Sequence, residues 1–83
     1  MRGITSLSSL GSAIRGERMR AGLTQAQLAE QAGMSRATVI GVESGSRFDI
    51  ATLLALIKTL GLEISLAPRS EAAASIFDET DEL

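Results

Sequence analysis

The chain has 83 residues and a formal net charge of −2, and it contains no cysteine, histidine, tryptophan or tyrosine. This length allows one small domain with a modest hydrophobic core, so we expect oligomerisation to add stability. The missing side-chain types remove thiol nucleophiles, the commonest general base and the usual transition-metal ligands. We therefore expect neither an enzyme nor a bound metal or cofactor.

Charge is divided unevenly along the chain. Residues 1–68 carry seven basic and five acidic side chains, whereas residues 69–83 carry one basic and five acidic side chains. A mildly basic body and a strongly acidic tail indicate two surfaces with different partners. No apolar run approaches the length of about 20 residues that spans a bilayer, and residues 1–10 lack the apolar core of a signal peptide. We expect a soluble, cytoplasmic protein.

The first predicted helix begins after Ser6, whose side chain can cap it, and ends at Gly22. Its apolar residues lie along one stripe and are Leu10, Ala13, Ile14 and Ala21. Such a stripe indicates that one face of the helix is buried.

A helix-turn-helix is predicted next, because two short helices with their own N-caps follow each other at about residues 25–32 and 36–44. The two caps, each with the residue three positions later that completes it, are Thr24 with Gln27 and Ser35 with Thr38. The small residues expected where the helices cross are Ala29 and Gly33, and the apolar residues expected in the core are Leu28, Met34, Val39 and Val42. Ordinary helical hairpins show the same pattern, so the caps alone leave DNA binding open.

A fourth helix is predicted after Asp49, which can cap it with Thr52 behind, and it ends at Gly61. The apolar residues that recur at helical spacing are Ile50, Leu53, Leu54, Ile57 and Leu60. This spacing is typical of a helix that closes a core.

After this helix the apolar period changes to two, because Leu62, Ile64 and Leu66 alternate with other residues until Pro68 ends the run. A lone strand leaves N–H and C=O groups unpaired, and the same strand of a second copy is the nearest partner. We predict an antiparallel ribbon across a two-fold dimer axis, with Leu56 helping to fill the dimer interface. The alternative is an extension that covers the end of the fourth helix.

The run IRGERMRAGLTQAQLAEQAGMSRATVIGVESG resembles the XRE family of helix-turn-helix proteins, which includes the lambdoid phage repressors. The matching elements are Arg18, residues 22–25, Leu28 with Ala29, Gly33, Ser35, and Glu43 with Gly45. The resemblance covers roughly residues 6–61. It implies an all-α, lambda-repressor-like fold of four to five helices, here with one C-terminal β-strand that pairs across a dimer.

The run LGLEISLAPR narrows the resemblance, because a strand directly after the fourth helix looks like HipB-type antitoxins. That likeness implies a dimeric autorepressor that binds palindromic operator DNA and a HipA-family serine/threonine kinase toxin. A stand-alone XRE-type repressor without a toxin and an interaction module that does not read DNA are the alternatives.

The resemblance and the geometry of a recognition helix predict the DNA contacts. Gln25 is expected on phosphate at the start of its helix, and Arg36 on guanine or on phosphate. The full predicted set is Gln25, Ser35, Arg36, Ala37, Thr38, Ile40, Gly41 and Arg47. Gly41 departs from the phage repressors, which often place a long polar side chain there. The resemblance also implies that Arg18 and Glu43 form a structural salt bridge.

We divide the chain into a DNA-binding domain over residues 1–61, a dimerisation strand over residues 62–68 and an acidic tail over residues 69–83. The tail has too few apolar residues to fold alone, so we expect it to be disordered in the free protein. Its apolar pair, Ile76 and Phe77, is a candidate anchor for the toxin. A solubilising tail, or one that competes with phosphate for the basic face, fits the composition equally well.

Overall fold

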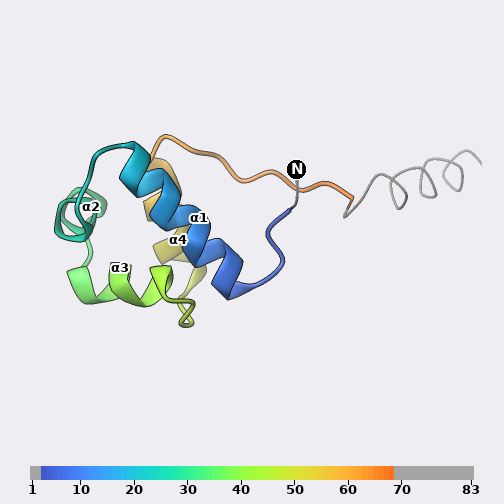
Figure 1. Ribbon diagram of the computed structural model, residues 1–83, viewed down its shortest axis with the longest axis horizontal. Coiled ribbons are helices and arrows are strands. Elements are labelled where there is room, and N and C mark those ends of the chain that lie inside the picture. The colour runs from blue at the N-terminus through green and yellow to red at the C-terminus, as the bar shows by residue number, and fades with distance from the viewer. Residues whose placement is uncertain (1–2, 69–83) are drawn as a thin grey trace, which may run out of the picture.

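The computed structural model describes residues 3–68 of the chain. Within this range the chain forms four α-helices: α1 (Leu7–Arg20), α2 (Gln25–Ala32), α3 (Arg36–Glu43) and α4 (Ile50–Thr59) (Figure 1). Helix α3 packs against both α1 and α2, and α4 packs against α2. The predicted all-α helix-turn-helix architecture is confirmed. Within the described residues, no helix is long and apolar enough to cross a membrane.

The helices begin at the predicted N-caps. Ser6, Thr24, Ser35 and Asp49 each accept a hydrogen bond from the backbone N–H three positions later. At Thr24 the Gln27 side chain also accepts from the cap's own N–H at 2.8 Å, which completes the capping box. The start of each described helix is therefore encoded locally.

The turn between α2 and α3 depends on Gly33, which has φ of +73°. The N–H of Met34 returns to the carbonyl of Ala29 at 2.9 Å, as in a Schellman motif. A Cβ at Gly33 would meet no other atom within 4 Å. The expectation that Gly33 is small because the helices cross there is therefore wrong; glycine supplies the left-handed turn, and the space beside it is open.

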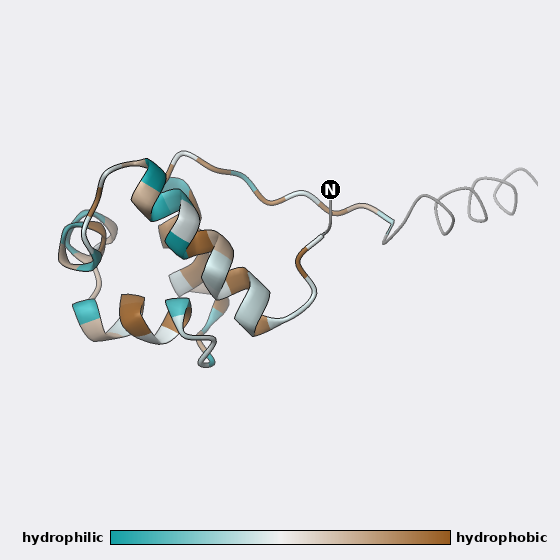
Figure 2. Ribbon diagram, viewed as in Figure 1, coloured by the Kyte–Doolittle hydropathy of each residue, from teal (hydrophilic) through white to brown (hydrophobic). Residues whose placement is uncertain are grey.

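The core lies between the four helices and is formed by Ile14, Leu28, Ala29, Val39, Val42 and Leu56, none of which is more than 3% exposed. Brown, apolar segments are visible on α1, α3 and α4 (Figure 2). Met34 and Leu10 are partly buried and pack against this core, as predicted. Ala21 is exposed and lies outside it.

Helix α4 is rotated relative to the prediction. Leu56 is fully buried in the core, so its predicted place in a dimer interface is wrong. Ile50 and Leu54, which were expected in the core, are 65% and 49% exposed. The helix carries apolar side chains on nearly every side, so the spacing of these residues was compatible with more than one buried face.

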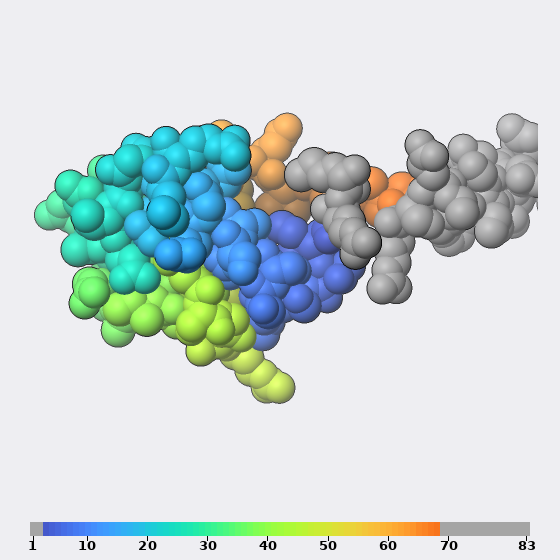
Figure 3. Space-filling model, in the orientation of Figure 1, coloured from blue at the N-terminus to red at the C-terminus, as the bar shows by residue number. Residues whose placement is uncertain are grey.

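Helices α1 and α3 touch through backbone at Gly11, a buried glycine. A Cβ at Gly11 would lie 2.4 Å from the carbonyl oxygen of Val42 and 2.7 Å from that of Glu43. In the space-filling view α1 (blue) and α3 (yellow-green) meet without a gap (Figure 3). Only glycine allows this approach.

After α4 the chain runs out from the helical body as an extended segment through residue 68 (Figure 1). Its first N–H, from Leu62, donates to the carbonyl of Ile57 at 2.9 Å and closes the helix. Within the described residues no strand is assigned to this segment, and Ile64 and Leu66 are 48% and 95% exposed. Strand pairing requires a second chain, so the predicted ribbon stays a prediction. The tail, including Ile76 and Phe77, lies outside the described residues.

Candidate DNA interface

The first turn of α3 presents exposed side chains around its N-cap. Arg36 and Ala37 are exposed, while Thr38 is half-buried. The hydroxyl groups of Ser35 and Thr38 are hydrogen-bonded at 2.9 Å, and Ser35 also accepts the N–H of Thr38 at 3.1 Å. Ser35 and Thr38 therefore fix the start of the helix, and Arg36 and Ala37 point outward from a rigid turn.

One turn later, the surface of α3 is formed by Ile40 and Gly41, which offer no polar side-chain group. Ile40 is 38% exposed although it is a large aliphatic residue. A Cβ added to Gly41 would make only one contact, an ordinary one of 3.8 Å with the Cβ of Ser46. No neighbour within the described structure therefore requires glycine at position 41.

The loop between α3 and α4 is exposed but anchored. Gly45 has φ of +88°, and a Cβ there would lie 3.3 Å from the Cα of Ser8 in α1. Beyond this anchor the loop projects from the body, and Arg47 is exposed on it (Figure 3). The loop is thus held at its base and carries an exposed cation, Arg47.

A buried ion pair joins Arg18 of α1 to Glu43, the last residue of α3. The Nε and Nη2 atoms of Arg18 donate to the two carboxylate oxygens of Glu43 at 2.6 and 3.1 Å. The side chains are 11% and 4% exposed, and Arg18 also donates to the carbonyl of Leu23 at 2.8 Å. Such a two-pronged guanidinium–carboxylate contact fixes both side chains. It ties α1 and the turn before α2 to the end of α3.

Gln25, the first residue of α2, belongs to the same network. Its Nε2 donates to Glu43 Oε1 at 3.2 Å. Gln25 is half-buried, and its backbone N–H lies in the first turn of a helix, where N–H groups have no partner within the helix. The structure thus brings Gln25 together with Arg18 and Glu43. Arg36 and Arg47 are exposed and take no part in this network.

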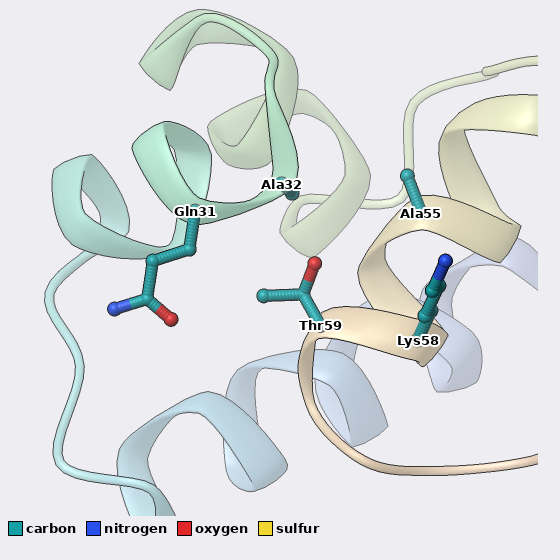
Figure 4. Close-up of a pocket in the computed structure, with 5 residues that line it drawn as sticks. All are labelled: Gln31, Ala32, Ala55, Lys58 and Thr59. Carbon is teal, nitrogen blue, oxygen red and sulfur yellow. The ribbon is translucent and has the colours of Figure 1, made fainter.

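A shallow groove of about 500 Å³ lies between α2 and α4. Gln31 and Ala32 line it from α2, and Ala55, Lys58 and Thr59 line it from α4 (Figure 4). Lys58 is the single titratable residue among these five. A groove of this composition offers no acid–base pair for catalysis.

Sequence reasoning missed the contact at Gly11 and the bond from Gln25 to Glu43. Gly11, Ile14 and Arg18 are the buried residues of α1 and follow each other at helical spacing. Because Gly11 and Arg18 share the buried face of Ile14, they could have indicated two contacts of this face. A buried glycine indicates close approach of backbone, and a buried arginine indicates a carboxylate partner. No sequence signal marks the bond between Gln25 and Glu43, because the two residues are 18 positions apart.

Residues 14–66 match the helix-turn-helix family profile, which is more than half of the chain. No curated protein sequence matches the chain. Solved structures do. A HipB variant in complex with an O2 20mer is 27% identical, covers 84% of this chain and 99% of that chain, and superposes with a TM-score of 0.77.

Other similar structures are restriction-modification controllers. The controller protein C.AhdI from Aeromonas hydrophila is 36% identical over 69% of this chain and 88% of that chain, with a TM-score of 0.66. A mutant of the controller protein C.Esp1396I is 27% identical over 92% of this chain and 91% of that chain, with a TM-score of 0.63.

The chain belongs to the helix-turn-helix family of XRE type. It is a DNA-binding regulator and not an enzyme.

Proposed function

We propose that the chain is a HipB-like antitoxin and autorepressor. It binds palindromic operator DNA as a homodimer in the cytoplasm, and it binds or neutralises a HipA-family serine/threonine kinase toxin. The supporting observation is the similarity to HipB over 84% of this chain and 99% of the HipB chain, a longer match than the four described helices alone provide. A HipA–HipB–O2–O3 complex, 25% identical to this chain, is also among the similar structures.

In this proposal α3 enters the major groove and the start of α2 binds the phosphate backbone. Arg36 reads guanine through its planar fork, and the methyl groups of Ala37, Thr38 and Ile40 contact thymine. Gln25 and Arg47 hold phosphates on either side. The complete proposed contact set is Gln25, Ser35, Arg36, Ala37, Thr38, Ile40, Gly41 and Arg47.

The dimer forms through residues 62–68, whose strands pair across the two-fold axis. The exposed apolar residues Ile64 and Leu66, together with Leu62, support this proposal, since an edge strand with apolar side chains favours pairing. Light scattering should report a dimer for the wild type and a monomer for Ile64→Asp. Met19→Asp, which replaces an exposed apolar residue of α1 at 56% exposure, is the matched control and should stay dimeric. A monomeric wild type would contradict the proposal.

The toxin is proposed to bind through the acidic tail, with Ile76 and Phe77 as the anchor. The test is co-expression of the chain with a HipA-family kinase from the same operon, followed by gel filtration. A complex that is lost on deletion of residues 70–83 supports the anchor. Tighter DNA binding by the deletion variant supports a tail that competes with phosphate, and no change in either assay supports a solubilising tail.

A second candidate function is a stand-alone XRE-type regulator without a toxin partner. The 36% identity to the controller C.AhdI favours it. The two functions differ in their partner, so failure of the kinase to co-elute while operator binding persists would replace the first proposal with the second. The third alternative is an interaction module that keeps the fold without reading DNA. A measurement of sequence-specific DNA binding would exclude it.

A further inference from the structure

The carboxylate of Glu43 has more partners than a structural ion pair needs. It accepts two hydrogen bonds from Arg18 and a third, at 3.2 Å, from Gln25 Nε2. The Glu43 side chain is only 4% exposed, whereas Gln25 is half-buried. The third bond reaches a residue at the proposed DNA surface.

Arg18 makes this arrangement compatible with an anion nearby. A free carboxylate next to a phosphate would repel it, but the guanidinium neutralises the charge of Glu43 through a two-pronged contact. The same guanidinium donates to the carbonyl of Leu23, two residues before Gln25. The network therefore fixes both the side chain of Gln25 and the turn that leads to it.

We propose that Glu43 is a positioning residue for DNA binding. By accepting one Nε2 hydrogen, Glu43 holds the Gln25 amide so that its second Nε2 hydrogen and the backbone N–H of Gln25 face one phosphate oxygen. The amide is then ordered before DNA arrives, which lowers the entropic cost of the contact. This inference rests on the proposed contact between Gln25 and phosphate.

The test uses a variant that removes the anchor but leaves Gln25 in place. Replacing both members of a buried ion pair by apolar residues is often neutral for stability, so the double substitution Arg18→Met with Glu43→Met should stay folded. We expect its affinity for operator DNA to fall at least about tenfold, as for Gln25→Ala, since a hydrogen bond to a charged group is lost. Adding Gln25→Ala to the double variant should cause no further loss.

The proposal would be overturned if the double variant bound operator DNA as tightly as the wild type. It would also be overturned if Gln25→Ala weakened DNA binding as much in the double variant as in the wild type. Gln31→Ala, at an exposed glutamine near the other end of α2, is the matched control and should bind as the wild type does. A wild type without DNA binding would instead contradict the proposed function.

A second measurement needs no DNA. Nuclear magnetic resonance relaxation of the Gln25 side-chain amide in the free protein should show an ordered group in the wild type and a mobile group in the Arg18→Met, Glu43→Met variant. A Gln25 amide that is already mobile in the wild type would overturn the proposal, whatever the affinity of the protein for DNA.

Discussion

Gly11 of α1 lies against the backbone of Val42 in α3, so closely that a Cβ at Gly11 would come within 2.4 Å of the Val42 carbonyl oxygen. This oxygen and the carbonyl oxygen of Glu43, 2.7 Å from the same Cβ position, are backbone atoms and cannot rotate away as a side chain would. The position of α3 relative to α1 therefore depends on the absence of a side chain at Gly11.

We predict that Gly11→Ala lowers the free energy of unfolding by about 1–3 kcal/mol, because the added methyl group forces α1 and α3 apart. Gly16→Ala is the control in the same helix, since a Cβ there meets no atom within 4 Å. It should raise stability by about 0.5–1 kcal/mol through better helix propensity. Urea denaturation measures both, and equal stability of the two variants would contradict the packing argument.

Removal of one partner of the buried ion pair should have a larger effect. Glu43→Ala leaves the Arg18 guanidinium without its carboxylate, and we expect a loss of about 3–5 kcal/mol. Glu17→Ala removes a carboxylate that is 33% exposed and lies 3.8 Å from the exposed Arg20, and its cost should stay below about 1 kcal/mol. Thermal denaturation distinguishes the two variants; an unchanged melting temperature for Glu43→Ala would show that the pair contributes little to folding.

Gly41 should separate stability from DNA binding. Gly41→Ala meets only the Cβ of Ser46 at an ordinary distance, so we expect a gain of about 0.5–1 kcal/mol in the free energy of unfolding. Because Gly41 belongs to the proposed contact set, the added methyl group should lie against the DNA and lower the affinity for operator DNA. Gly16→Ala gives the same gain in stability away from α3 and should not change affinity. Unaltered DNA binding by Gly41→Ala would remove Gly41 from the interface.

The cap of α4 should make stability depend on pH. Hydrogen bonds from the backbone and side chain of Thr52 lower the pKa of the Asp49 carboxyl below its ordinary value. The unfolded chain therefore takes up this proton at a higher pH than the folded chain does. The contribution of Asp49 is present above the unfolded-state pKa and is lost as the pH falls through the folded-state value.

Asp49→Asn keeps a good N-cap without a titrating group. Chemical denaturation at about pH 6 and about pH 3 should show a smaller acid-induced loss of stability in Asp49→Asn than in the wild type. Equal losses in the two proteins would show that this cap does not contribute to acid sensitivity.

The sequence predicted the local features of the fold well, because caps and turns depend on residues a few positions apart. Ser6, Thr24, Ser35 and Asp49 all cap helices as expected. The buried face of α4 was not predictable in the same way: Leu56 faces the core and Leu54 faces outward, although both are leucine. Which of them is buried depends on the neighbouring helices, since the helix itself is apolar on nearly every side.

In the candidate site, too, local features could be predicted from the sequence, whereas contacts between helices could not. Arg36 and Ala37 are exposed on the first turn of α3, where helix periodicity placed them. The bond between Gln25 and Glu43 depends on how α2 crosses the end of α3. That crossing is set by the core, where Leu28 and Ala29 of α2 are buried with Val39 and Val42 of α3. Strand pairing of residues 62–68 depends on a second chain.

We propose that the chain reads a specific DNA sequence as an autorepressor. This is tested by fluorescence anisotropy of the purified protein on its own upstream DNA and on scrambled DNA, at two salt concentrations. We predict tight binding to the upstream DNA alone, weakened at the higher salt concentration because phosphate contacts release counterions. Equal and weak binding to both DNA fragments would contradict the claim.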